Sequence, residues 1–307
     1  MMTGKATLPV VILIFLCYWI MFFAPLSHIM GSDVETIING LCYVAIGYIL
    51  IEFNNSFSII RLRTSSQTFI FFLLVMACGC INQTINGNLT TISILISLFF
   101  LFKSYNNTEA TNNLFYSFLF IGIGSLLIPQ IIYFSILWIY TTIRFKSFTI
   151  QNLFAMLIGW FFPYWLLFSY AFLFNKMGLF YQPFNEMIAF SPLQPFRTMQ
   201  AIDLYTLSYI LLLYIVSFAH YLTVDYEDKI QTRSYLSFLY QFTFFLFLFI
   251  LFIPKHLKNL MPLLLSNISI INAHYLLLRN TKLSNLFFII SIMIFLFLLS
   301  YHIWILL

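Results

Sequence analysis

Hydrophobic residues occur along this chain in long continuous runs separated by short polar segments. Such runs predict membrane-spanning α-helices, because the strands of a membrane barrel would alternate apolar and polar residues instead. The runs give eleven candidate spans, at residues 7–26, 35–53, 67–82, 88–103, 113–128, 130–143, 153–175, 204–224, 235–253, 260–278 and 284–303. Several are shorter than the roughly 20 residues of a full crossing, so we expect them to extend into polar flanks or to cross only part of the bilayer.

The stretch from Asn113 to Lys146 decides the topology, because Pro129 and Gln130 interrupt it near its middle. As one helix of about 30 residues it would be about 45 Å long, against a hydrocarbon core of roughly 30 Å. As two helices joined by a turn at Pro129, each member is short for a crossing. The two alternatives place everything that follows on opposite sides of the membrane.

The distribution of Lys and Arg favours two helices. With two helices and a cytoplasmic N-terminus, the cytoplasmic side has ten basic residues: Lys5, Arg61, Arg63, Lys103, Arg144, Lys146, Lys229, Arg233, Arg279 and Lys282. The other side then has four: Lys176, Arg197, Lys255 and Lys258. A single helix gives eight against six. The excess of positive charge on cytoplasmic loops therefore predicts a helical hairpin around Pro129.

Composition places the whole chain in one class. Of 307 residues, 62% are hydrophobic and 7% are charged, which is too little charge to cover a water-soluble domain of this length. We therefore predict an all-α, polytopic transmembrane bundle, with residues 1–307 as a single integral-membrane domain surrounded by membrane lipids. The net charge of +5 reflects the excess of Lys and Arg on the cytoplasmic loops. Because no cluster of basic residues is longer than two, we expect no nucleic-acid partner. With 10 glycines against 39 phenylalanines, we expect helix packing to use aromatic and aliphatic contacts more than small-residue seams.

The cysteines and histidines predict no metal site. Four cysteines fall inside apolar runs: Cys17, Cys42, Cys78 and Cys80. The last two form a Cys-x-Cys pair, but no His or acid accompanies it, so buried, inert thiols are the favoured interpretation. No cofactor is evident.

Polar groups within the spans are costly in hydrocarbon, so each is a candidate for function. Glu52 lies at the end of a span and is interpreted as an interfacial carboxylate. His274 follows Asn267 by seven residues on the same helical face, and we expect this face to make interhelical hydrogen bonds. We predict that the cluster of Asp225, Glu227 and Asp228 lies in a solvated turn. No span has an acid near its centre, which disfavours an ion-coupled transporter.

The predicted outward loops contain the best candidates for catalytic and phosphate-binding residues. Asp33 and Glu35 lie in the first such loop, and the later loops have four basic or titratable residues: Arg197, Lys255, His256 and Lys258. An acid that accepts a hydroxyl proton, near cations that hold a phosphate, is the minimum for glycosyl transfer from a lipid phosphate. The alternative is that Ser32 or Asp33 caps the following helix, with Glu35 in its first turn.

The longest outward loop runs from Asn175 to Asp203. It has three prolines, four phenylalanines and few charges, so it is too apolar for a solvated linker. We expect a short amphipathic or re-entrant segment at the membrane interface.

The segment from Leu89 to Phe174 resembles the middle of integral-membrane glycosyltransferases of the GT-C type. The resemblance is a sequence of features: a basic polar loop, a short span with Gly-x-Gly-Ser-Leu, Pro129, and a second short span that ends in Arg-x-Lys. It implies a GT-C-like bundle and a polyprenyl-phosphate lipid as sugar donor. It also implies a catalytic acid soon after the first span, where Asp33 is the matching loop residue. In that family the first outward loop is long, whereas here it has about ten residues.

The whole chain is also similar to an uncharacterised family of bacterial inner-membrane proteins, most clearly over MPLLLSNISIINAHYLLLRNTKLSNLFFII. This likeness implies a multi-pass protein of the bacterial inner membrane and no particular activity. The leading hypothesis is a GT-C-like protein of cell-envelope, lipid-linked glycan metabolism, either a glycosyltransferase or a relative without activity. One alternative is a non-catalytic subunit or scaffold that binds other envelope membrane proteins. Another is a lipid or small-solute transporter.

Overall fold

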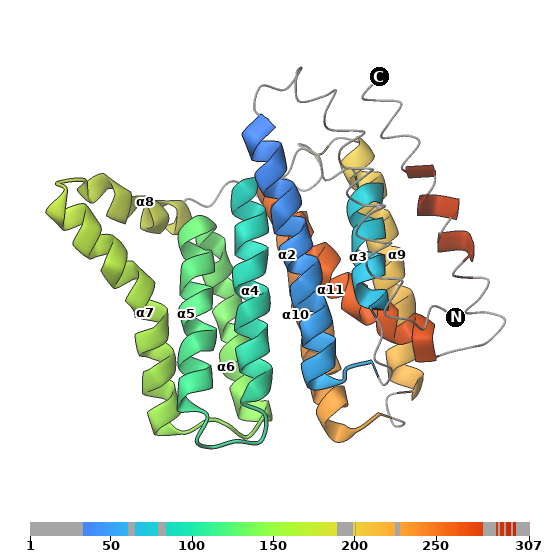
Figure 1. The fold of residues 1–307 in the computed structure, drawn as a ribbon, viewed down its shortest axis with the longest axis horizontal. Coiled ribbons are helices and arrows are strands. Elements are labelled where there is room, and N and C mark those ends of the chain that lie inside the picture. The colour runs from blue at the N-terminus through green and yellow to red at the C-terminus, as the bar shows by residue number, and fades with distance from the viewer. Residues whose placement is uncertain are drawn as a thin grey trace. The chain divides into compact units, whose positions relative to one another are not determined.

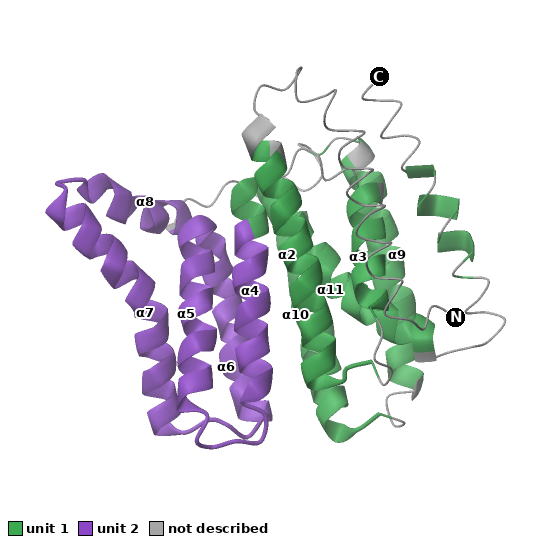
Figure 2. Cartoon of the chain, viewed as in Figure 1, with its two compact units in different colours: residues 1–88, 194–307 green, residues 89–193 purple. Residues whose placement is uncertain are grey.

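The computed structural model describes residues 33–60, 65–78, 84–188, 199, 201–224, 228–278, 287, 289–291, 293–295 and 297–298. All regular secondary structure in these residues is helical, as the sequence predicts (Figure 1). The chain divides into two compact units (Figure 2). Unit 1 comprises residues 1–88 and 194–307, and unit 2 comprises residues 89–193.

The helices of unit 1 come from both ends of the chain. They are α2 (Asp33–Phe57), α3 (Ser66–Ala77), α9 (Ala201–Val224), α10 (Ile230–Phe252), the 3-10 helix η4 (Pro254–His256) and α11 (Leu257–Leu278). The first residues of α4 (Ile85–Lys103) also belong to unit 1. Unit 2 continues with α5 (Thr111–Leu127), the 3-10 helix η2 (Pro129–Phe134), α6 (Ser135–Arg144), α7 (Ile150–Leu173) and α8 (Met177–Ile188).

Six segments of the described helices are long and apolar enough to cross a membrane. They are Ile37–Phe57, Ile85–Lys103, Ile150–Leu173, Asp203–Thr223, Ile230–Phe252 and Pro254–Leu277. Two shorter apolar helices, Ser66–Met76 and Thr111–Leu127, coincide with predicted short spans. The predicted span 7–26 lies outside the described residues, and 284–303 is described only in part. A helical membrane protein with several spans is therefore supported.

Helix α11 forms the centre of unit 1. In its most apolar window 89% of the residues are buried, and it packs against α3, α9 and α10. The helix also contains serines, whose hydroxyl groups would be costly to bury without partners. Ser266 donates a hydrogen bond to the carbonyl oxygen of Leu263 (2.8 Å), and Ser269 donates to that of Ser266 (2.7 Å). These bonds within the helix satisfy the serines and allow the helix to be buried on nearly all sides.

The stretch around Pro129 is two helices, as the charge distribution predicts. Helix α5 ends at Leu127, and Ile128 is extended (φ −133°, ψ 96°), which is the conformation that a following proline favours. The chain then forms η2 and returns as α6. The amide of Asn106, before α5, donates to the carbonyl oxygen of Phe145, after α6 (2.8 Å). The two ends of the hairpin are therefore at the same end of unit 2.

Helices α5 and α7 approach each other closely at two glycines, although the sequence predicts that most helix packing uses aromatic and aliphatic contacts. A Cβ on Gly159 would lie 2.4 Å from the carbonyl oxygen of Phe115, and one on Gly122 would lie 2.9 Å from that of Trp160. Real Cβ atoms do not approach backbone oxygen so closely. Two glycines are therefore enough to let the helices approach closely, because both lie where the helices cross.

The start of the long apolar loop is the amphipathic helix α8, as predicted for part of 175–203. Its Phe180 and Phe184 pack on Phe168 and Tyr164 of α7, with ring centroids 5.2 and 5.5 Å apart. Its polar residues Gln182, Asn185 and Glu186 are exposed. Figure 1 shows α7 bending away from α5 and α8 lying across the direction of α5. Pro163 lies within α7, where it removes one helical hydrogen bond.

Side chains of η2 hold the last turn of α8. Tyr133 donates its hydroxyl hydrogen to the carbonyl oxygen of Met187 (2.8 Å), and the amide nitrogen of Gln130 donates to that of Glu186 (3.3 Å). The last carbonyls of a helix have no partner within the helix. The turn at Pro129 therefore positions α8 as well as reversing the chain.

Candidate functional site

The residues predicted to carry glycosyl transfer are only partly described. Helix α2 begins at Asp33, so Glu35 lies in its first turn, where its side chain is exposed. Lys255 and Lys258 are exposed, and His256 is half-buried with its ring 6.2 Å from that of Phe249. Arg197 and the side chain of Asp33 lie outside the described residues.

Polar contacts bring the starts of α2, α4 and α11 together at one end of unit 1. The amide nitrogen of Asn88 donates to Oδ1 of Asn39 (2.9 Å), which joins α4 to α2. The hydroxyl of Thr84 donates to Oδ1 of Asn259 (2.7 Å), which joins the start of α4 to α11. A Cβ on Gly87 would lie 2.6 Å from the backbone oxygen of Asn259, so this approach requires glycine.

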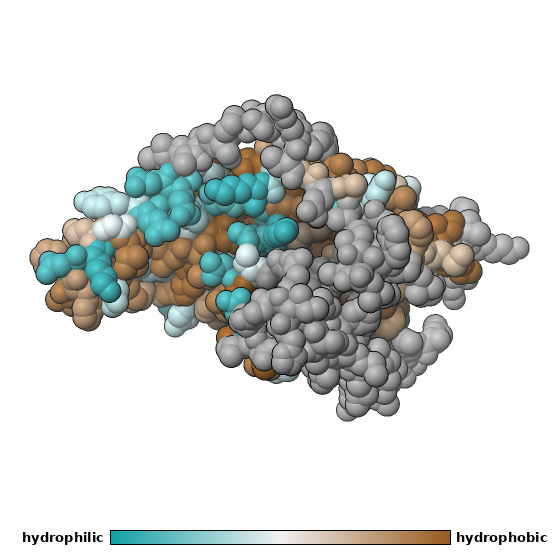
Figure 3. Space-filling model, turned by 90° about the horizontal axis from the view of Figure 1, so that it is seen from above, coloured by the Kyte–Doolittle hydropathy of each residue, from teal (hydrophilic) through white to brown (hydrophobic). Residues whose placement is uncertain are grey.

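This arrangement places Glu35 at the same end of unit 1 as Lys255 and Lys258. We call these three residues the acid–lysine end. Within the described ranges no ion pair joins Glu35 to either lysine, and all three side chains are exposed. Figure 3 views the molecule from above, where hydrophilic residues are visible among the described ones.

A second polar group of unit 1 is buried, at the opposite end of α11. Nε2 of His274 lies 3.2 Å from Oδ2 of Asp228, and their side chains are 3% and 4% exposed. The prediction that Asp228 belongs to a solvated turn is wrong. Asp228 stands just before α10, and the packing of α10 against α11 buries it. Asp225 and Glu227 lie outside the described residues.

The contact between Asp228 and His274 is close but is not an ordinary hydrogen bond. Nε2 of His274 faces Oδ2 of Asp228, yet it makes no hydrogen bond of ordinary geometry. Both side chains are buried, so the contact belongs to the interior of unit 1. His220 of α9 is also buried nearby, with its ring 5.0 Å from that of Tyr275.

The expectation of interhelical hydrogen bonds from the face with Asn267 and His274 is wrong for both residues within the described part of the chain, because the contact of His274 with Asp228 is not a hydrogen bond. The Asn267 side chain is fully buried, and neither its oxygen nor its nitrogen has a hydrogen-bond partner among the described residues. An interhelical bond instead comes from Asn272, whose Oδ1 accepts from the hydroxyl of Ser217 on α9 (2.9 Å). Sequence reasoning did not single out Asn272 or Ser217.

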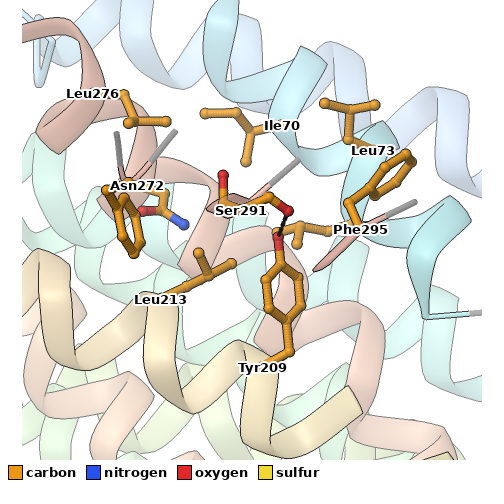
Figure 4. Close-up of a pocket in the computed structure, with 10 residues that line it drawn as sticks. Ile70, Leu73, Tyr209, Leu213, Asn272, Leu276, Ser291 and Phe295 are labelled. Atoms are coloured by element: carbon orange, nitrogen blue, oxygen red, sulfur yellow. Dashed lines mark hydrogen bonds between the residues drawn. The ribbon is translucent and has the colours of Figure 1, made fainter. Parts of the chain in front are cut away.

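A small pocket lies beside Asn272, among α3, α9, α11 and residues near the C-terminus (Figure 4). Its volume is about 40 Å³. The lining is mainly apolar: Ile70, Leu73, Leu74, Leu213, Leu276, Phe287 and Phe295. Its polar members are Tyr209, Asn272 and Ser291, and the hydroxyl of Tyr209 donates to the carbonyl oxygen of Ser291 (3.1 Å).

Glu52 and the described cysteines lie where the sequence predicts. Glu52 is exposed, and the thiols of Cys42 and Cys78 are free and buried. Cys17 and Cys80 lie outside the described residues. Within the part of the chain that is described, no three His, Cys, Asp or Glu side chains come together as a metal site would require.

Comparisons with known proteins add no family to this description. No protein-family model, no curated protein and no solved structure matches the chain. What characterises the chain is therefore its own architecture: within the described residues, it has six helices able to cross a membrane, an acid–lysine end, and a buried contact of Asp228 with His274 at the other end of α11.

Proposed function

We propose that this chain is a GT-C-like protein of the bacterial inner membrane that binds a polyprenyl-phosphate lipid at the acid–lysine end. The observation that carries the proposal is the common location of Glu35, Lys255 and Lys258 at one end of unit 1. Exposed cations at the level of a membrane surface suit a phosphate, because charge-assisted bonds to phosphate oxygens are strong. The role is in lipid-linked glycan metabolism of the cell envelope.

In this proposal the acids and the cations have separate tasks. Lys255 and Lys258, with Arg197, hold the carrier phosphate and stabilise the charge that develops on it as the sugar leaves. Asp33 acts as the general base and accepts the proton of the attacking hydroxyl. Glu35 lies two residues further along the chain. His256 lies between the two lysines and contacts the same headgroup.

Binding is the first test. The purified protein in nanodiscs is titrated with polyprenyl phosphate, and Lys255→Gln/Lys258→Gln is compared with wild type. We expect at least tenfold weaker binding, since even one charge-assisted contact is worth about 1.5–3 kcal/mol and the variant removes two. Lys229→Gln is the matched control: Lys229 is exposed too, but it precedes α10, about 34 Å along the helix from η4. Equal binding by all three proteins contradicts the proposal.

Catalysis is tested separately. Asp33→Asn and wild type are compared for transfer of sugar from a polyprenyl-phosphate donor and for envelope glycan in cells, at equal protein abundance. We expect loss of both activities with lipid binding retained, because an amide cannot accept the proton. Normal transfer by Asp33→Asn rejects the enzyme while leaving lipid binding intact.

The exposure of α7 favours one second candidate, a non-catalytic subunit of an envelope complex. Only 28% of the apolar window of α7 is buried within the protein, against 89% for α11. A subunit of this kind uses such a helix to contact other membrane proteins. Purification in mild detergent distinguishes it, because a chain isolated without any stoichiometric partner argues against the subunit role.

A further inference from the structure

We propose that one end of unit 2 binds the phosphate of an anionic phospholipid through Lys103, Arg144 and Lys146. We call these three residues the basic end. The proposal does not depend on the acid–lysine end, because every residue that it uses belongs to unit 2. Three observations support it: a rigid pair of connections between helices, a lysine in a conformation that favours glycine, and exposed apolar side chains beside the cations.

Hydrogen bonds hold the α4–α5 connection against the α6–α7 connection. The backbone amide of Asn106 donates to the carbonyl oxygen of Phe145 (2.8 Å). The side-chain amide of Asn152 donates to the carbonyl oxygens of Thr108 (2.9 Å) and Ser147 (2.6 Å), one in each connection. Figure 1 shows both connections at the end of unit 2 that is opposite to α8. The cations of the basic end therefore extend from a backbone that is fixed.

The cations of the basic end outnumber the acids beside them. Lys103 and Arg144 are the last residues of α4 and α6, and the side chains of all three cations are exposed. Glu109 is the only acid in the two connections. Like charges that gather on one surface attract an anion, and phosphate oxygens form strong charge-assisted hydrogen bonds with Lys and Arg. The basic end is therefore suited to a phosphate.

Lys146 has a backbone conformation in which glycine is the usual residue. Its φ is 56°, in the left-handed region. Its amide donates to the carbonyl oxygen of Ile143 (3.1 Å), and the amide of Ser147 donates to that of Thr142 (3.1 Å). These two bonds form the Schellman motif that ends α6, and glycine is common at its left-handed position because it has no Cβ. A lysine there costs stability, and binding of an anion by its charge offsets that cost.

Exposed apolar side chains beside the cations favour a lipid over a free phosphate. Ile143 and Phe148 lie next to the cations in the chain and are 56% and 41% exposed. Ile150, the first residue of α7, is 77% exposed. A free phosphate would contact only the cations and leave this apolar surface uncovered. A phospholipid covers it with acyl chains while its phosphate contacts the basic end.

Photolabelling in nanodiscs tests the proposal. The full-length protein is reconstituted with a phosphatidylglycerol that has a diazirine in its headgroup, or with a phosphatidylcholine that has the same diazirine. Labelled peptides from 104–110 and 145–149 are then quantified. We expect the phosphatidylglycerol probe to label them more than about tenfold more strongly, because three cations attract a headgroup with a net negative charge. Equal labelling by both probes overturns the proposal. Loss of labelling when inorganic phosphate is added at constant ionic strength also overturns it, because the site would then bind free phosphate.

Lys146→Gly separates lipid binding from stability. It removes one cation and relaxes the left-handed backbone, so we expect labelling by the phosphatidylglycerol probe to fall about fivefold while the thermal unfolding midpoint in detergent rises. Asn106→Gly is the matched control, because Asn106 also has a positive φ (54°) but no charge, and we expect its labelling to be unchanged. Undiminished labelling of Lys146→Gly, or an equal fall in both variants, overturns the proposal.

Discussion

The buried contact of Asp228 with His274 shows how much one polar contact can matter when it is removed from solvent. Their side chains are 4% and 3% exposed, so water does not replace a contact that is lost. Formation of such a pair contributes little net stability compared with an apolar pair of the same shape. Loss of one member is different, because the buried polar group of the other then loses one of its contacts.

We therefore expect His274→Leu to lower the stability of the protein by about 1–3 kcal/mol, because the buried Asp228 carboxylate loses its contact with the imidazole. Asp228→Asn/His274→Leu replaces that carboxylate by a neutral amide and should recover part of the loss. Thermal unfolding in detergent, measured for wild type, both variants and the exposed control Lys229→Gln, checks the prediction. If the double variant is as unstable as His274→Leu, the loss comes from packing rather than from the carboxylate.

At this scale the sequence identified one member of the pair and missed the other. His274 was noticeable because it interrupts an apolar run, and so was Asn267 on the same face. Asp228 belongs to a short acidic segment between two helices, a pattern that ordinarily lies in water. Asp228 is buried because α10 packs against α11, and a single sequence does not tell which helices pack together.

At the scale of the elements, the crossing of α5 and α7 predicts a clear effect of a single substitution on stability. Gly159→Ala places a Cβ 2.4 Å from the Phe115 carbonyl oxygen, so the helices must separate, and we expect a loss of about 1–3 kcal/mol. Gly178→Ala in α8 is the control, since no atom lies within 4 Å of its Cβ position. The thermal unfolding midpoints of the two variants give the comparison, and equal midpoints would mean that the crossing is looser than described.

The docking of α8 on η2 is tested by removing its two side-chain contacts. Gln130→Ala/Tyr133→Phe leaves the last carbonyls of α8 without these donors. We expect faster amide hydrogen exchange over Met177–Ile188 with little change in α5, because the variant loosens one end of a short helix. Tyr140→Phe, at an exposed position of α6, should leave exchange unchanged. Unaltered exchange in the double variant would show that the ring contacts with α7 suffice.

Most elements could be predicted from the apolar runs, and the reason is physical. A membrane helix must satisfy its backbone internally, so hydropathy alone locates it to within a few residues. Pro129 likewise ends α5 through a local effect on Ile128. What required the structure was the packing between elements: the two glycines of the α5–α7 crossing, and the side chains of η2 that hold α8.

At the scale of the molecule, the α5–α6 hairpin determines the topology. The contact of Asn106 with Phe145 requires that both connections lie on one side of the membrane. Reporter domains fused after Glu109 and after Ser147 should therefore give the same localisation, and one fused after Lys176 the opposite. Alkaline phosphatase and a fluorescent protein report the two sides. Opposite results for Glu109 and Ser147 would mean that the stretch crosses once.

The division into units has a consequence for how a cell makes this protein. Unit 2 is one continuous segment, whereas unit 1 needs residues from both sides of it, and its central helix α11 is synthesised after the whole of unit 2. During synthesis, α2 and α3 enter the bilayer long before the helix that buries them exists. Unit 2 can complete its contacts first. A ribosome that stops before Leu257 thus releases a chain with one finished half and exposed polar and apolar surfaces on α3, α9 and α10, which quality-control proteases of the membrane can recognise.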